Sequence, residues 1–149
     1  VLLVYFAESD EKQPLRIEQG KNGFEKNKGT KNIDIKIASS DTFIDECKWA
    51  DIIYFSGGRT TQLMEVLKKY TGLNELFMGK TIGGDSAGAN VLGKYFYSKS
   101  SQEVGEGLGI LPVKVLVHYS DDAPNPFENI EPDLETVFLH EYETKVFYK

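Results

Sequence analysis

Cysteine and histidine are scarce in this sequence, and their scarcity excludes two kinds of protein. Cys47 is the single cysteine, so the chain cannot form an internal disulfide. One cysteine and two histidines are also too few to complete a structural zinc site. We therefore expect no metal and no other cofactor, and a cytoplasmic location in which the thiol stays reduced.

The sequence also lacks a long hydrophobic run and an excess of basic residues. No apolar run approaches the ~20 residues that a membrane-spanning helix needs. Aspartate and glutamate number 23 against 17 lysines and arginines, which gives a net charge of −6, and the charges are scattered along the chain. We expect neither a membrane nor a nucleic acid as a partner.

Length and composition fit one ordinary globular domain. The chain has 149 residues, of which 40% are hydrophobic, enough to bury a sizeable core. We therefore expect a single domain spanning residues 1–149. The segment from Val1 to Ala7 has no initiator methionine and no basic flank, so its pattern predicts a strand and not a signal peptide. The chain is expected to begin partway through a fold.

Apolar runs alternate with helical patterns along the chain. The candidate strands are residues 1–7, 33–37, 51–55, 80–84, 95–97, 113–118, 137–139 and 145–148. Helical spacing of apolar residues occurs at 43–49, 63–70 and 87–93. The polar, glycine-containing stretch 8–31 is expected to hold at most a short helix. This alternation predicts an α/β fold with a mostly parallel sheet and a site at the carboxyl ends of its strands.

The most informative motif is Gly84-Asp85-Ser86-Ala87-Gly88, a G-x-S-x-G sequence where a strand gives way to a helix. In a nucleophile elbow, strand and helix pass so close that the residues two before and two after the serine must be small. Gly84 and Gly88 meet that demand. The motif predicts that Ser86 is a catalytic nucleophile and that the backbone N–H of Ala87 stabilises the oxyanion. A chance glycine-rich turn is the alternative.

A serine nucleophile needs a base, and the chain has two imidazoles. His118 ends an apolar strand, so in a parallel sheet it should emerge at the same carboxyl edge as Ser86. His140 lies near the end of the chain, between Leu139 and Glu141. We therefore assign the role of base to His118, with a surface histidine at a strand end as the alternative.

The carboxylate that would orient this base is less clearly marked. Glu103 and Glu106 are the carboxylates between Ser86 and His118, and Asp121 and Asp122 follow closely. We choose Glu103 over Glu106, because Glu106 lies in a glycine-flanked turn that leads to the next strand.

A second glycine turn, Ser56-Gly57-Gly58, follows another buried strand and precedes another helix. Its backbone amides are placed to complete an oxyanion hole opposite Ala87. A phosphate-binding loop is the competing interpretation. It fails because the chain has no G-x-G-x-x-G, and neither Gly79-Lys80-Thr81 nor the glycines between 83 and 88 complete a Walker A sequence.

Three segments taken together are more specific than the elbow alone. They are the segment from Tyr54 to Leu63, the segment from Gly84 to Asn90, and the run from Gly107 to Pro112 that leads to His118 and Tyr119. These segments resemble the peptidase family of aspartyl dipeptidase (dipeptidase E) and cyanophycinase. Members of that family have a flavodoxin-like α/β sandwich, a three-layer fold related to the class I glutamine amidotransferases.

The resemblance implies a serine-type peptidase that hydrolyses a short peptide or small amide through an acyl-enzyme. It implies Ser86 as the nucleophile, His118 as the base, and the amides of Gly58 and Ala87 as the oxyanion hole. Glu103 completes this set as our choice of orienting carboxylate. A small peptide substrate is then the expected partner, and a homo-oligomer is left open.

The sequence departs from the family pattern at three points. The family's third triad member has no clear match in residues 97–103, and the family normally has more sheet on both sides, so this chain is a fragment or a shortened member. The acidic stretch 121–128 would repel an aspartyl substrate, so Asp-Xaa specificity is not implied. Two alternatives stay open: a catalytically degenerate member that serves as a ligand-binding or assembly module, and an esterase of the α/β-hydrolase fold.

Overall fold

The computed structural model describes residues 1–148, which divide into two compact units. The first unit runs from Val1 to Gly88, and the second begins at Ala89. Our expectation of one domain over residues 1–149 stays a prediction. Among the described residues, no helix has the length and apolar character needed to cross a membrane.

The first unit contains a parallel four-stranded sheet in the order β2-β1-β3-β4. This order is that of flavodoxin-like folds. Its strands are β1 (Leu2–Val4), β2 (Lys36–Ile37), β3 (Ile52–Phe55) and β4 (Thr81–Gly84). Its helices are α1 (Gln13–Asn27), α2 (Phe43–Trp49), α3 (Thr60–Leu67) and α4 (Leu73–Leu76), and α5 (Ala87–Leu92) begins at the end of this unit.

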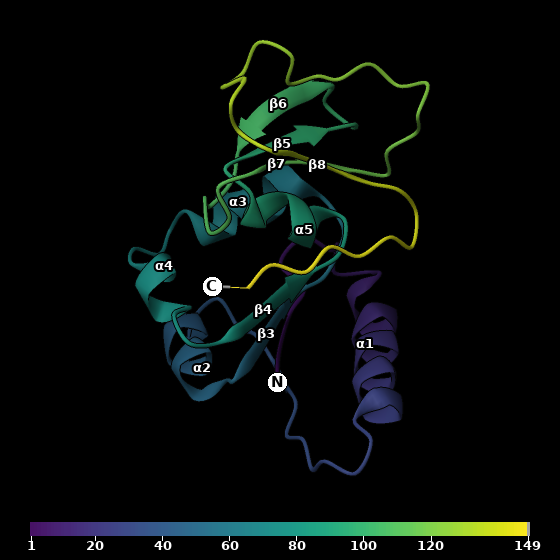
Figure 1. Cartoon of the computed structure of the whole chain (residues 1–149). Helices are drawn as coiled ribbons and strands as arrows, with labels where there is room; N and C mark the ends of the chain where they lie inside the picture. Colours follow the sequence, from purple (N-terminus) through teal and green to yellow (C-terminus); the bar gives the residue numbers. More distant parts are fainter. Residues whose placement is uncertain (149) are drawn as a thin grey trace. The chain divides into compact units, whose positions relative to one another are not determined.

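Helices cover both faces of this sheet because side chains alternate along its strands. On β3, the ring of Tyr54 meets Phe24 of α1 at 5.8 Å between centroids. The neighbouring Phe55 points to the opposite face, where its ring meets Phe77, just after α4, at 6.0 Å. Figure 1 shows α1 on one side of β3 and β4, and α2 and α4 on the other. The first unit thus has the helix–sheet–helix layering of a three-layer sandwich.

The length of α1 is the main error in our sequence prediction. We expected at most a short helix between residues 8 and 31, but α1 spans 15 residues. Pro14 does not interrupt it because proline is tolerated in the first helical turn. No side chain of α1 is fully buried, so its sequence carries little apolar periodicity. Packing supplies the stability instead: a Cβ on Gly20 would lie 3.4 Å from Cδ1 of Leu3 on β1 and 2.0 Å from the Tyr5 hydroxyl, so α1 lies directly on these side chains.

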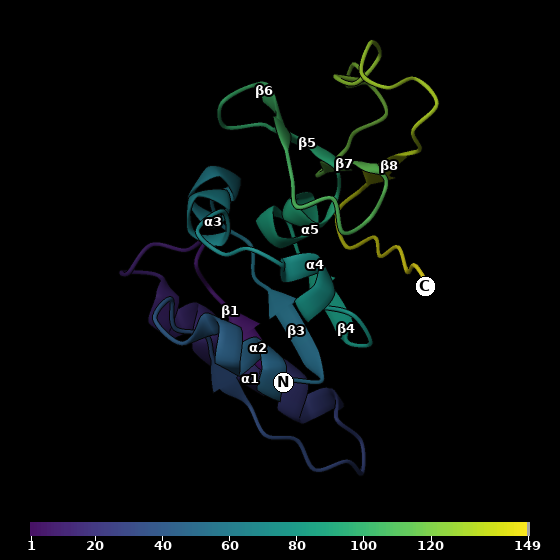
Figure 2. The ribbon, with the colours of Figure 1, turned by 90° about the vertical axis from the view of Figure 1, so that its left-hand side faces the viewer.

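The second unit contains another four-stranded sheet, in the order β6-β5-β7-β8 (Figure 2). Its strands are β5 (Tyr95–Ser98), β6 (Glu103–Glu106), β7 (Lys114–Val117) and β8 (Thr136–Leu139). Only the hairpin of β5 and β6 is antiparallel within the described residues. A cluster of buried valines at 113, 115, 117 and 137 forms the core between β7 and β8.

Two predictions for the second unit were wrong. We placed Glu106 in a glycine-flanked turn and kept Glu103 apart from it, but both residues lie on β6. The sequence of β6 has little apolar alternation, and the strand exists because β5 pairs with it in a hairpin. Residues 145–148 were expected to form a strand and do not, although Phe147 packs against the valine cluster. The strands expected at 95–97, 113–118 and 137–139 are confirmed.

Five of the six strand pairings in the described residues are parallel. The chain therefore has an α/β fold with mostly parallel sheets, as its sequence predicted, consistent with a flavodoxin-like three-layer sandwich. In such folds the loops that follow the strands gather at the carboxyl edge, and that edge is where ligands bind.

Candidate active site

The turn between β4 and α5 has the backbone of a nucleophile elbow. Ser86 adopts a φ of 47°, in the left-handed region that costs an L-residue on the order of 1–3 kcal/mol. The N–H of Asp85 donates to the carbonyl of Phe55 at 3.1 Å, which holds the turn against β3. Helix α5 begins directly after Ser86, at Ala87. The strand–turn–helix context that we predicted for Ser86 is confirmed.

Gly88 lies at the point where α5 passes β3. A Cβ on this residue would stand 1.9 Å from the carbonyl oxygen of Phe55, which is far inside van der Waals contact. Because this oxygen is a backbone atom, no side-chain rotation could relieve the clash. The small residue that we expected two positions after the serine is therefore required by the packing of α5 on β3.

The second glycine turn lies beside this elbow within the first unit. The N–H of Gly57 donates to Oδ2 of Asp85 at 3.1 Å, and a Cβ on Gly57 would lie 3.2 Å from the Cβ of Ser86. Gly58 has a φ of 137°, and a Cβ there would lie 2.3 Å from the carbonyl oxygen of Ala7. The first unit thus brings the Ser56–Gly58 turn, which carries one expected oxyanion-hole residue, next to Ser86 and Ala87.

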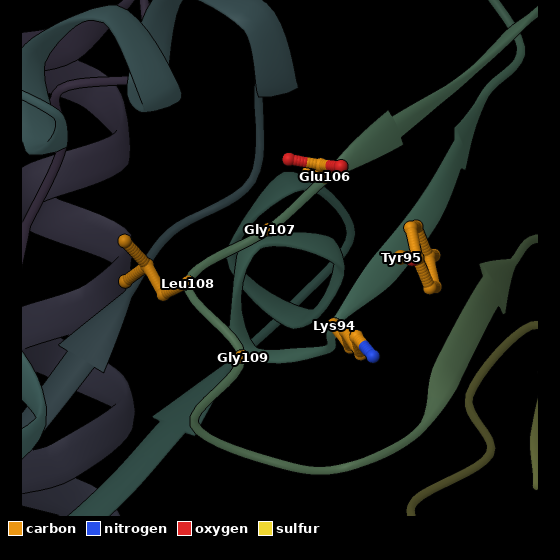
Figure 3. Close-up of a pocket in the computed structure, with 6 residues that line it drawn as sticks. All are labelled: Lys94, Tyr95, Glu106, Gly107, Leu108 and Gly109. Carbon is orange, nitrogen blue, oxygen red and sulfur yellow. The ribbon is translucent and has the colours of Figure 1, made fainter. Parts of the chain in front are cut away.

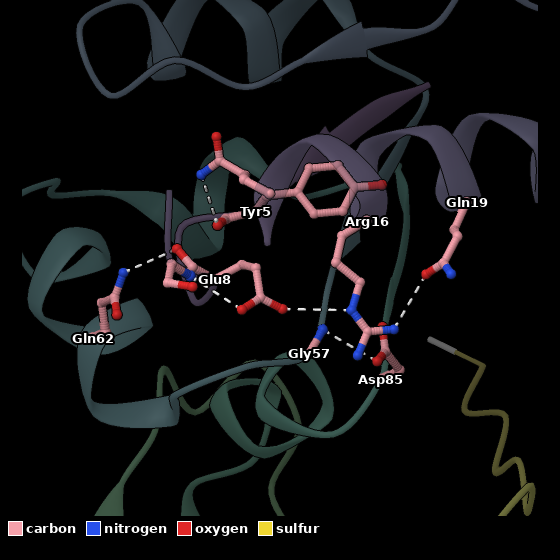
Figure 4. A network of polar contacts seen from close by, with 9 residues as sticks. Tyr5, Glu8, Arg16, Gln19, Gly57, Gln62 and Asp85 are labelled. Atoms are coloured by element: carbon pink, nitrogen blue, oxygen red, sulfur yellow. Dashed lines mark hydrogen bonds and ion pairs between the residues drawn. The ribbon is translucent and has the colours of Figure 1, made fainter. Parts of the chain in front are cut away.

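The loop after β1 completes this edge of the sheet, a contribution that the sequence analysis missed. The backbone N–H of Arg59 donates to the carbonyl of Ala7 at 2.8 Å, and Gln62 Nε2 donates to the carbonyl of Glu8 at 3.2 Å. The Glu8 carboxylate is nearly buried and pairs with Arg16 Nε at 3.4 Å (Figure 4). The signal in the sequence was a buried-strand pattern that ran directly into an acidic residue.

Two tyrosines of the same unit lie within the electrostatic reach of Asp85. Burial raises the pKa of the Tyr54 phenol, and the charge and hydrogen bond of Asp85 raise it further. Burial also raises the pKa of Tyr5, and Asp85 again adds to the effect. Both phenols therefore stay protonated at neutral pH, and their hydroxyl groups remain available as hydrogen-bond donors.

The predicted base, His118, lies in the second unit, directly after β7. It has a φ of 54°, so the chain turns sharply there. Its Nδ1 contacts Oε1 of Glu141, and Lys99 Nζ donates to its carbonyl oxygen. Glu141 follows β8, the parallel neighbour of β7. The contact arises because the ends of adjacent parallel strands are about 4.8 Å apart.

Glu103, our expected orienting carboxylate, occupies a different position in this sheet. It begins β6, where it pairs with Ser98, and β5 separates β6 from β7. Two strand spacings, about 10 Å, therefore lie between the backbone of Glu103 and that of β7. Sequence reasoning missed Glu141. The available signal was its place just beyond an apolar strand that could pair with the strand of His118.

The second histidine forms a separate polar cluster. His140 Nδ1 lies 3.0 Å from Glu143 Oε2, and its Nε2 lies 3.2 Å from Asp121 Oδ1. The hydrogen bond to Glu143, followed by that to Asp121, raises the pKa of His140. Its ring also meets the ring of Tyr119 at 5.3 Å, edge to face. His140 thus connects the loop after β7 to the loop after β8, next to His118 and Glu141.

An open pocket of the second unit lies at the other end of the strands (Figure 3). Its lining residues are Lys94, Tyr95, Glu106, Gly107, Leu108 and Gly109. Tyr95 begins β5, whereas His118 follows the carboxyl end of the parallel strand β7. Lys94 Nζ is already paired with Glu131 Oε1, which also accepts a hydrogen bond from the Tyr95 hydroxyl. The pocket is therefore separate from the His118 cluster.

Comparisons with solved structures find the same fold in proteins of low sequence identity. A peptidase from an acI-B1 Actinobacterium is 23% identical with a TM-score of 0.65, over 92% of this chain and 64% of its own length. A candidate peptidase E protein from Listeria monocytogenes EGD-e is 20% identical with a TM-score of 0.62, over 92% of this chain and 75% of its own. At these identities the likeness concerns the fold. This chain thus spans somewhat less than two thirds of the actinobacterial peptidase.

A comparison with curated protein sequences gives no significant match. A family model does match, and it covers nearly the whole chain, from residue 1 to residue 146. The match includes the glycine turn, the serine elbow, and the strands that carry His118 and Glu141. The chain belongs to peptidase family S51.

Proposed function

We propose that the protein is a serine peptidase that hydrolyses short peptides or small amides, with Ser86 as the nucleophile. The observation that carries the proposal is the left-handed backbone of Ser86, at a φ of 47°, between a buried strand and a helix. Such strain is retained where it exposes a nucleophile. Membership of peptidase family S51 supports the same reaction class.

In this mechanism His118 acts as the base. Its Nδ1 faces Glu141, so Nε2 is the nitrogen that accepts the proton of the Ser86 hydroxyl. The serine oxygen then bonds to the substrate carbonyl carbon, and the carbonyl oxygen becomes the oxyanion. The imidazolium returns the proton to the leaving amine as the amide bond breaks. Water repeats the sequence on the acyl-enzyme and releases the acid.

Three further groups have assigned roles in this mechanism. The backbone amides of Gly58 and Ala87 donate to the oxyanion. Glu141 orients the ring of His118 and stabilises its protonated form, the role for which we first chose Glu103. Contact between Glu141 and Nδ1 of the ring supports this revision.

The substrate is proposed to be a short peptide without a preference for an N-terminal aspartate. Asp121 and Asp122 follow His118 closely and are exposed, and a carboxylate substrate would be repelled there. Profiling against a dipeptide library with free and blocked termini tests this specificity. A cytoplasmic location and the absence of a nucleic-acid partner remain expectations from composition.

A fluorophosphonate probe tests the proposed function directly. We expect the purified protein to be labelled at Ser86, with the modified peptide identified by mass spectrometry. The Ser86→Ala variant serves as the control and should not be labelled. A folded wild-type protein that takes no label, and cleaves no member of the dipeptide library, would contradict the proposal and favour a binding or assembly module.

A further inference from the structure

The Asp85 side chain joins the two turns that follow β3 and β4. Its Oδ2 accepts the backbone N–H of Gly57 at 3.1 Å, across 28 residues of sequence. Its own backbone is fixed at both ends, because its N–H donates to Phe55 and its carbonyl accepts the N–H of Gly88 at 2.8 Å. The carboxylate therefore extends from a rigid elbow to a neighbouring turn (Figure 4).

The two glycines of the turn that receives this carboxylate, Gly57 and Gly58, have no side chains to hold them in place. A Cβ on Gly57 would lie 2.6 Å from Asp85 Oδ2, so the contact exists only because residue 57 is a glycine. A hydrogen bond from a backbone N–H to a carboxylate is about twice as strong as a neutral one. The Tyr54 hydroxyl also faces Asp85, and it offers a second donor from the same strand end.

The position of this turn matters for the reaction because Gly58 follows Gly57 directly. An oxyanion-hole donor acts only when its N–H is held 2.7–3.1 Å from the position that the oxyanion will occupy. Gly57 and Gly58 have no β-carbon, and glycine is the residue whose backbone has the most freedom to depart from one conformation. The bond from Gly57 to Asp85 removes that freedom at the residue beside the donor.

We propose that Asp85 is a positioning residue that holds the Ser56–Gly58 turn at a fixed distance from Ser86 and so preorganises the oxyanion hole. The proposal rests on the proposed function, since the hole is needed only if Ser86 is acylated. The proposal gives a role to residue 85, the variable position before the serine in the G-x-S-x-G motif. The carboxylate acts through the backbone of Gly57 and has no contact with the substrate.

The test compares Asp85→Ala and Asp85→Asn with the wild-type protein, and uses Asp51→Ala as a matched control. Asp51 is exposed and precedes β3, at the edge of the same sheet opposite to the elbow. Fluorophosphonate labelling gives both the maximal rate of modification and the probe concentration for half-maximal rate. Amide hydrogen exchange of the segment 56–58 reports the contact without requiring activity.

We expect Asp85→Ala to lower the maximal labelling rate by up to about 10²-fold while the half-maximal concentration changes little. Exchange at residues 56–58 should accelerate in the same variant. The labelling rate of Asp85→Asn should lie between those of Asp85→Ala and the wild type, because its amide oxygen still accepts one hydrogen bond. If Asp85→Ala fails to fold, the isosteric Asp85→Asn variant carries the comparison. Asp51→Ala should match the wild type in both measurements.

Two different failures are distinguishable. A wild-type protein that is never labelled would overturn the proposed function, and the role of Asp85 with it. A labelled wild type whose Asp85→Ala variant reacts at the same rate, or shows unchanged exchange at residues 56–58, would overturn the role of Asp85 alone. A rise in the half-maximal concentration at a constant maximal rate would also contradict it, because that result would mean that Asp85 binds the probe.

Discussion

Nδ1 of His118 contacts Oε1 of Glu141, and the two residues follow the neighbouring parallel strands β7 and β8. The register of these strands, with Val117 opposite Leu139, puts Glu141 one residue beyond the position opposite His118, at the same edge of the sheet. The contact engages Nδ1 of the ring, and in the proposed mechanism Glu141 is the group that orients His118. The choice of orienting carboxylate is therefore open to a direct test.

We predict that Glu141→Gln lowers kcat by up to about 10⁴-fold, because an amide can stabilise the wrong tautomer and not the imidazolium. Glu103→Gln should change kcat little. Both side chains are exposed, so both variants should melt near the wild-type temperature. Steady-state kinetics on the best dipeptide substrate and thermal melts check these expectations. A large loss in Glu103→Gln with none in Glu141→Gln would restore our first assignment.

The backbone strain at Ser86 should appear as a stability difference between two inactive variants. Ser86→Ala keeps the Cβ in the left-handed region, whereas Ser86→Gly removes it. We expect the glycine variant to be the more stable of the two by about 1 kcal/mol. Urea unfolding followed by circular dichroism measures the difference. An alanine variant at least as stable as the glycine variant would show that the elbow is not strained.

Two glycine-to-alanine substitutions should have opposite effects on the free energy of unfolding. Gly88→Ala places a methyl group against the carbonyl of Phe55, so we expect the free energy of unfolding to fall by about 3 kcal/mol and activity to be lost. Gly23→Ala lies on α1, where the new methyl group would meet no atom within 4 Å beyond the backbone of its own helix, and it should gain about 0.5–1 kcal/mol. Chemical denaturation of both variants tests the pair, and a stable Gly88→Ala would refute the close packing of α5 on β3.

The cluster around His140 predicts a specific pH dependence. Glu143 and then Asp121 raise the pKa of His140 above its usual 6.5, so folding favours the protonated ring. This contribution to stability is fully present below pH 6.5 and is lost as the pH rises through the raised pKa. As the pH rises from 6.5 through the raised pKa, we expect the urea midpoint of the wild type to fall relative to the midpoint of His140→Gln. Parallel curves for the two proteins would mean that the cluster contributes nothing to folding.

The elements that bury apolar surface were predictable from local pattern. The strand Ile52–Phe55 is apolar along its length, and the apolar residues of the pattern at 63–70 recur at helical spacing and fall largely on α3 (Thr60–Leu67). Each segment therefore tends to bury the same side chains in any compact fold. The elbow was predictable for the same reason. Small residues around Ser86, between a strand and a helix, indicate a close approach of the two elements, and the structure shows that approach at Gly88.

Helix α1 and strand β6 could not be found in this way. α1 buries no side chain completely, so its apolar pattern is weak, and the helix depends on the sheet beneath it. Likewise β6 carries two glutamates and a glycine in four residues, and only its pairing with β5 makes it a strand. In both cases the stabilising partner lies elsewhere in the chain. Local propensity is too weak to reveal such an element without knowledge of that partner.

The sequence by itself determined the α/β class, the strand ends at which polar residues gather, and the serine of the elbow. Each of these follows from interactions within a few residues or from the periodicity of one element. The tertiary structure alone decided that Glu141 meets His118 and that Asp85 meets Gly57, across 23 and 28 residues. These contacts depend on which strands become neighbours and in which register, and strand pairing is set by the summed burial of the whole sheet, which no short motif records.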